Sequence, residues 1–199
     1  MQHSARSEDR LMATMGARNK MDEEMKIIGR YTAVCRDKEG NVLWTEEFDN
    51  LLTQVGKGLL LDQGLAGSSY TGLEYMGLIS SVSFSAVSGG DTMGAHGGWL
   101  EAGAANAPTY SGTRLTAAWN ASTLSGASAY TATKALSAGL TFTFTGSGTV
   151  QGAFLVGGAG AASTIASTGG TLFSAGTFTT PQPVISTNTL TISYSVTLT

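Results

Sequence analysis

Charged side chains are scarce in this sequence. Asp, Glu, Lys and Arg make up 13% of the 199 residues, roughly half the share that is usual in soluble domains. Twenty of the 25 charged residues lie in positions 1–62, and none follows Lys134. The net charge of −3 provides no basic field to attract nucleic acid. We therefore expect a mixed-charge N-terminal part, a neutral body and no nucleic-acid partner.

Cysteine, proline and long apolar runs are also rare. Cys35 is the single cysteine, so no disulfide can form within the chain. Three prolines argue against a collagen-like or proline-rich disordered chain. Residues 1–20 lack the continuous apolar segment of a signal peptide, and no run of ~18 apolar residues predicts a transmembrane helix. We expect synthesis in a reducing cytoplasm and no membrane partner.

The sequence does contain many short segments in which apolar and polar residues alternate. Residues 27–48 predict a β-hairpin that turns at Gly40, and residues 140–145 and 189–199 alternate apolar residues with Thr and Ser. Such strands, separated by Gly-rich turns, indicate an all-β fold: a β-sandwich or its jelly-roll variant. The residues expected to face the core are Leu140, Phe142, Phe144, Phe154, Ile192, Tyr194 and Val196.

One segment has a helical period instead. The spacing of leucines predicts a short α-helix near residues 50–62, capped by Asp49 or Asn50. Because Gly56 and Gly58 weaken this helix by ~1 kcal/mol each, we expect it to pack against a sheet. The helix belongs to a sandwich domain that we place at residues 26–199.

Residues 1–25 are expected to form an N-terminal arm. Leu11, Met12 and Met15 make a short apolar stripe, which is too weak to fold alone at this length. We expect the arm to contact a neighbouring chain. An alternative is that Met25 is the natural start of the protein.

The residue types that catalyse reactions or bind metals do not cluster. The two histidines are His3 and His96, whereas a metal site needs three or four converging ligands. Glu46 and Glu47 are adjacent and fall on opposite faces of a strand, so they cannot act as a pair. Cys35 is expected in the core. We therefore predict a protein that is not an enzyme and has no cofactor.

The neutral Thr- and Ser-rich body is the most informative feature. Hydroxyl groups do little to stop the edges of a sheet from pairing, a task usually given to Lys and other charges. We therefore expect neighbouring subunits to cover this surface, with residues 157–170 and 179–188 as contact loops; a solvated monomer is the alternative. The residues expected at interfaces are Leu11, Met12, Met15, Trp99 and Thr180.

The order of several segments resembles a group of tailed-bacteriophage virion proteins. The segments are DKEGNVLWTEEFDNLLTQVGKGLLLDQ, YMGLI, DTMGAHGGWLE, TVQGAFLV and LFSAGTF, followed by the alternating C-terminal strand. The resemblance covers residues 27–199 and leaves the arm unmatched. It implies a capsid cement or decoration protein with a jelly-roll-like sandwich. Such a protein binds the major capsid protein on the virion surface and is a homo-oligomer on the particle.

Two other functions remain open at this stage. A phage tail, fibre or receptor-binding (adsorption) protein would also suit uncharged β-structure, although a fibre should show internal repeats, and none is present. A carbohydrate-binding or hydrolytic β-domain would need clustered aromatic and carboxylate side chains. Trp99 near Glu101 is the one candidate for such a cluster.

Overall fold

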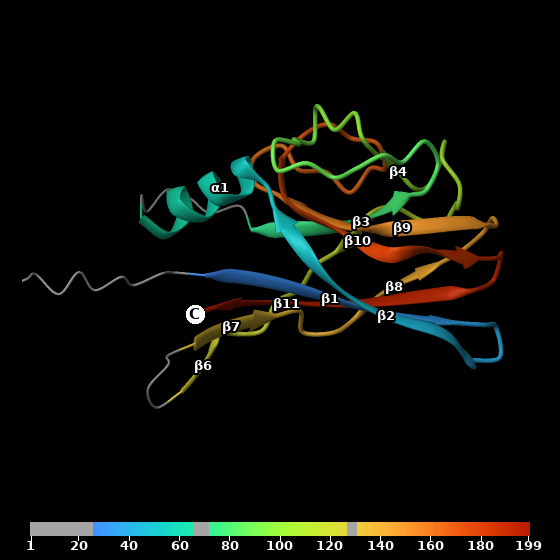
Figure 1. Cartoon of the computed structure of the whole chain (residues 1–199), viewed down its shortest axis with the longest axis horizontal. Helices are drawn as coiled ribbons and strands as arrows, with labels where there is room; N and C mark the ends of the chain where they lie inside the picture. Colours follow the sequence, from blue (N-terminus) through green and yellow to red (C-terminus); the bar gives the residue numbers. More distant parts are fainter. Residues whose placement is uncertain (1–25, 66–71, 127–130) are drawn as a thin grey trace, which may run out of the picture.

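The alternating segments of the sequence pair into two antiparallel layers, so the fold is all-β and sandwich-like, as expected (Figure 1). The computed structural model describes residues 26–65, 72–126 and 131–199. Within these ranges the elements are, in chain order, β1 (Ile27–Arg36), β2 (Val42–Leu52), α1 (Gln54–Leu65), β3 (Leu73–Ser80), β4 (Leu100–Glu101), β5 (Leu115–Thr116), β6 (Thr123–Ser125), β7 (Thr131–Ala135), β8 (Leu140–Thr143), β9 (Gly148–Gly157), β10 (Thr171–Val184) and β11 (Thr189–Leu198).

The two layers share one long strand. β2 pairs with β1 from Val42 to Asp49 and then with β10 from Asn50 to Leu52, so it passes from one layer to the other. The first layer, here named the threonine sheet, contains β1, β11, β7, β6, β8 and the first part of β2. The second layer, here named the covered sheet, contains β10, β9, β3, β4, β5 and the end of β2. In Figure 1 the covered sheet is the upper layer, and β2 crosses between the two.

The strand order partly matches a jelly roll. The pairs β1–β11, β2–β10 and β3–β9 are nested along the chain, as they are when a long hairpin is rolled up. In a jelly roll, successive nested pairs alternate between the two sheets. Here β2–β10 and β3–β9 lie in the same sheet, because β9 and β10 also pair with each other. The described strands therefore form a sandwich with nested pairs in which this alternation is missing.

The main core lies between the two layers, where the expected apolar faces meet. The core positions predicted on β8, just after it and on β11 line it, fully or partly buried: Leu140, Phe142, Phe144, Ile192, Tyr194 and Val196. Phe154 is also buried, but on the other face of β9, where it belongs to a second apolar cluster. β9 is thus apolar on both faces, which is typical of a central strand.

The helix begins later than the sequence predicts. Asn50–Leu52 continue β2 because they pair with β10, so neither Asp49 nor Asn50 caps the helix. Thr53 is the N-cap, and its Oγ1 accepts a hydrogen bond from the amide of Gly56 at 3.0 Å. The first turn packs closely on β10, and a Cβ at Gly56 would collide with the carbonyl of Phe173. This contact explains why glycine is used at a helical position that it weakens.

Residues 179–184 are not the loop that the sequence suggested. They continue β10 to Val184 through a wide irregularity between Thr177 and Gln182, where β10 contributes more residues than β9. Thr180 lies in this irregular stretch and is exposed. Segment 158–170 is a loop between β9 and β10, as expected.

The edges of the described sheets are protected without many charges. β4 and β5 have two residues each and β6 has three, and short edge strands give little template for pairing with another chain. Beyond Gly176, β10 no longer pairs with β2, and the prolines at 181 and 183 remove two backbone donors from that stretch. Edge protection alone therefore does not require a covering subunit in this part of the chain.

Both ends of the sandwich lie together. The amide of Lys26 donates to the carbonyl of Thr199 at 2.9 Å, and the amide of Thr199 donates back to Lys26 at 3.0 Å. The expected arm, with Leu11, Met12 and Met15, lies outside the described residues.

Candidate interaction surfaces

The chemically reactive side chains of the described residues do not converge. Within residues 26–65, 72–126 and 131–199, no group of three or more His, Cys, Asp or Glu residues is arranged to hold a metal ion. Cys35 is fully buried, and this burial raises the pKa of its thiol from the ordinary 9.0 to about 11. A thiol that stays protonated at neutral pH is a poor nucleophile, so Cys35 acts as a small core residue.

Trp99 is a core residue, which corrects the prediction that it lies at an interface. Its side chain is 1% exposed and packs in the cluster that contains Phe154, with the two ring centroids 5.3 Å apart. Its Nε1 donates to Asp91 Oδ2 at 2.9 Å, and the ring of His96 stacks on it at 3.9 Å. Asp91 also accepts the amide of Ser88, so these polar groups fix the conformation of segment 81–99, while Trp99 packs it on Phe154 of the covered sheet.

A buried ion pair, which the sequence did not reveal, fixes a second covering loop. Arg114 Nε and Nη2 donate to the two carboxylate oxygens of Glu101, each at 2.8 Å, and Arg114 is 1% exposed. Arg114 also donates to the carbonyls of Ala162 and Ser167, while Glu101 accepts the amide of Ala166 at 2.7 Å. The pair therefore joins the region around β4 to loop 158–170.

The scarcity of charge was the available signal for this pair. Glu101 and Arg114 are two of the five charged residues that follow Asp62. Ionised side chains are almost never fully buried unless they are paired. When an otherwise neutral region contains one acidic and one basic residue close together in the sequence, these two residues are thus candidates for an internal ion pair. Glu101 is engaged with Arg114 and Trp99 is buried, so the two do not form an open carbohydrate site.

The outer face of the threonine sheet has the opposite character. On β11, β8, β7 and β6 the side chains opposite the core are almost all hydroxyl-bearing, namely Thr189, Thr191, Ser193, Ser195, Thr197, Thr141, Thr143, Thr131, Thr133, Thr123 and Ser125. Hydroxyls pair across the strands, with Thr141 and Thr191 at 2.8 Å and Thr133 and Thr197 at 3.0 Å. We call these positions the hydroxyl face.

No charged side chain belongs to the hydroxyl face. Lys134 is the one charged residue of β6, β7, β8 and β11. It lies in register with Val196, whose side chain packs against the main core, and its Nζ donates to the carbonyl of Asn120 at 2.9 Å. On β1 and β2 the same side of the sheet is charged, with Arg30 paired to Asp49 at 3.2 Å. The neutral and charged halves of one sheet face thus lie side by side.

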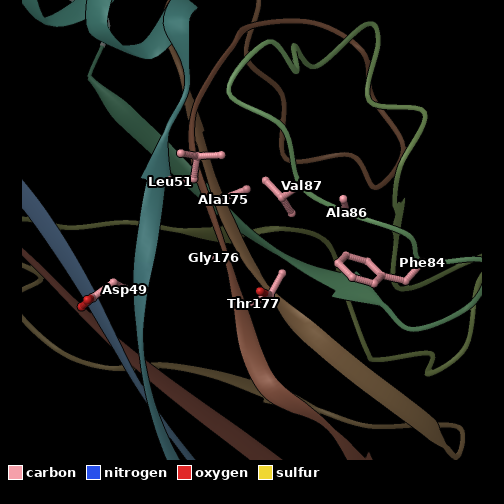
Figure 2. A pocket seen from close by; sticks show the side chains of 8 residues that line it. All are labelled: Asp49, Leu51, Phe84, Ala86, Val87, Ala175, Gly176 and Thr177. Atoms are coloured by element: carbon pink, nitrogen blue, oxygen red, sulfur yellow. The ribbon is translucent and has the colours of Figure 1, made fainter.

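An apolar groove opens where β2 leaves β10 (Figure 2). It has a volume of about 320 Å³, and its lining residues are Asp49, Leu51, Phe84, Ala86, Val87, Ala175, Gly176 and Thr177. The side chain of Leu51, on the β2 wall, is 42% exposed. The neighbouring helix α1 exposes further leucines, including Leu61 and Leu65. Exposed apolar area of this kind marks a candidate binding surface.

Thr180 is exposed, as expected for an interface position, whereas Trp99 is internal. Among the described residues, no helix is long and apolar enough to cross a membrane. The candidate surfaces are therefore the hydroxyl face, the exposed stretch around Thr180 and the apolar groove.

Comparison of the chain with protein-family models, with curated proteins and with solved structures finds no match. The case for a function therefore depends on the surfaces described above and on the sequence resemblance.

Proposed function

We propose that the protein is a structural protein of a bacteriophage virion, of the capsid cement or decoration type. It binds the lattice of the major capsid protein from the outside, next to further copies of itself, and stabilises the head. The proposal is supported by the resemblance of residues 27–199 to phage head proteins. It is also supported by a large sheet face that is unusually easy to dehydrate.

The hydroxyl face is the observation that carries the proposal. Covering a hydroxyl that finds a hydrogen-bond partner costs little, whereas covering an unpaired charge costs several kcal/mol. Each Å² of apolar surface that is buried with it contributes ~25 cal/mol. Thr141 and Thr191 already satisfy each other across the strands, so a contacting subunit need not supply a partner for every hydroxyl. A neutral face of this kind suits permanent contact over a broad area.

The face also offers a matched test of the proposal. Thr45 and Thr141 are both exposed and lie in one row of the threonine sheet, which runs through Thr45, Val34, Thr191 and Thr141 on four neighbouring strands. Thr141 belongs to the neutral half and Thr45 to the charged half. Thr141→Lys and Thr45→Lys therefore introduce the same charge on the same face, about 14 Å apart from strand spacing.

The experiment measures how many copies of each variant bind to phage particles. Particles lacking the protein are incubated with wild-type chain, Thr141→Lys or Thr45→Lys, and bound copies are counted against the major capsid protein by gel densitometry. We expect wild type to bind in hundreds of copies. Thr141→Lys should bind roughly 100-fold more weakly, which corresponds to about 2.7 kcal/mol, and Thr45→Lys should bind like wild type.

Two results would contradict the proposal. If all three proteins leave the particles unchanged, the protein does not bind the capsid. If the native virion holds only a few copies, the protein belongs to the tail or to an adsorption structure, the alternative that the sequence left open.

A further inference from the structure

The apolar groove lies next to the start of helix α1. The amide of Gln54, the first residue of α1, donates to the carbonyl of Gly89 at 2.8 Å, so the helix starts beside the segment that forms the groove rim. Leu51 and Val55, on either side of this junction, are 42% and 38% exposed. Figure 2 shows Leu51 on one side of the groove, facing Val87 and Phe84 on the other.

Helix α1 exposes apolar side chains in more than one direction. Its sequence, QVGKGLLLDQGL, contains two charged residues, and its apolar residues are spread around the axis. Among its residues the structure classes only Gly56 as buried, while Leu61 and Leu65 are 54% and 82% exposed. These exposed leucines extend the candidate apolar binding surface beyond the groove.

The N-terminal segment of the same chain is attached close to this surface. Asp49, which lines the groove, is in register with Arg30 on the adjacent strand, and Arg30 lies three residues after the start of β1 at Ile27. The start of β1 is therefore roughly 11 Å from Asp49, from the rise per residue along the strand and the spacing across it. The eleven residues between Met15 and Ile27 can span ~40 Å when extended.

The chemistry of that segment also fits the groove. Leu11, Met12 and Met15 are the apolar residues of a stretch that otherwise contains charged and small residues. Methionine side chains adapt to irregular apolar surfaces. A short tether gives the attached segment an effective concentration in the millimolar range, which favours binding within one chain over binding to a second copy.

We propose that the apolar groove binds the stripe Leu11, Met12 and Met15 of the chain's own N-terminal segment. This intramolecular contact differs from the contact with a neighbouring chain that the sequence first suggested. It does not depend on the proposed capsid function.

The test uses cysteine pairs in the full-length protein. The native Cys35 is buried, so introduced thiols at exposed positions can be studied beside it. Met12→Cys is combined with Ala86→Cys, on the groove rim, or with Thr141→Cys, on the hydroxyl face; both Ala86 and Thr141 are exposed. Mild oxidation is followed on non-reducing gels, and the bonded peptides are identified by mass spectrometry.

We expect a disulfide within one chain to form at least roughly tenfold faster for the Ala86→Cys pair than for the Thr141→Cys pair. The rate should not change when the protein is diluted, and adding Val87→Asp should slow it toward that of the Thr141→Cys control. Circular dichroism spectra identical to wild type would confirm that each variant is folded.

Three outcomes would overturn the proposal. The first is equal rates for the two pairs, and the second is no disulfide with Ala86→Cys. The third is a disulfide between chains that disappears on dilution, which would show that the stripe binds a neighbouring copy of the chain.

Discussion

The two sheets of this sandwich share one core but differ on their outer faces. The covered sheet has large apolar side chains on its outer face, including Phe154, Val156 and Leu172, and segments 81–99 and 158–170 fold over them (Figure 1). The outer face of the threonine sheet carries hydroxyls, and among the described residues no comparable loop layer lies on it. The residue type at the outward positions therefore decides whether further segments of the chain must fold over a sheet.

The two outer faces differ in the free energy that each side chain gains when it is covered. Complete burial of a large apolar side chain contributes about 1.5–3 kcal/mol relative to exposure, so an uncovered Phe154 or Leu172 would lose that contribution. Threonine at an outward position fits a pleated strand and still bonds to water or to its neighbour. The covered face is thus a structural part of the fold, while the described residues leave the hydroxyl face uncovered.

The largest effect should come from breaking the ion pair that holds the cover of the covered sheet. We expect Arg114→Ala to lower the free energy of unfolding by about 3–5 kcal/mol, because the carboxylate of Glu101 would stay buried without its counter-charge. Urea unfolding followed by tryptophan fluorescence measures this change. Arg30→Ala removes an exposed ion pair with Asp49 and should cost no more than about 1 kcal/mol. Similar losses for the two variants would show that the buried pair does not hold the loop layer.

A smaller effect should come from Trp99, which anchors segment 81–99. We expect Trp99→Phe to cost about 1–3 kcal/mol, because it removes a buried hydrogen bond to Asp91 and leaves the carboxylate with fewer donors. Trp44 provides the matched control, since its Nε1 donates to the carbonyl of Pro183 at 3.1 Å in an exposed setting. Trp44→Phe should cost less than about 1 kcal/mol. Thermal or urea unfolding of the two variants compares them directly, and an equal cost would contradict the structural role given to the Asp91 contact.

The smallest effect should come from the hydroxyl face itself. Thr191→Val keeps the branched shape and removes one hydroxyl, which pairs with Thr141 at the surface. We expect the free energy of unfolding to change by less than about 0.5 kcal/mol, as for most surface substitutions. Denaturant unfolding provides the measurement. A loss above roughly 1 kcal/mol would mean that the hydroxyl pairs stabilise the sandwich and are not free for contact with a partner.

Much of the threonine sheet followed from local pattern. The alternation in residues 189–199 predicted that Leu190, Ile192 and Tyr194 face the core, and all three are buried. The hairpin at residues 27–48 was also predicted, with Gly40 at the turn in a left-handed conformation (φ 89°). The limits of the helix were wrong because pairing with β10 keeps Asn50–Leu52 in a strand. A helical spacing of leucines cannot report a partner strand more than a hundred residues away.

The sequence by itself determined which side of each amphipathic strand is apolar, and therefore the all-β class and the neutral hydroxyl face. This is possible because side chains alternate at every residue of an extended chain, so the pattern is local. Only the tertiary structure decided that Trp99 is internal, that Arg114 pairs with Glu101, and that the outer face of β9 is covered. Those outcomes depend on which distant segments meet. Burial and ion pairing depend on these tertiary contacts, since the same side chain can be exposed in one arrangement and enclosed in another.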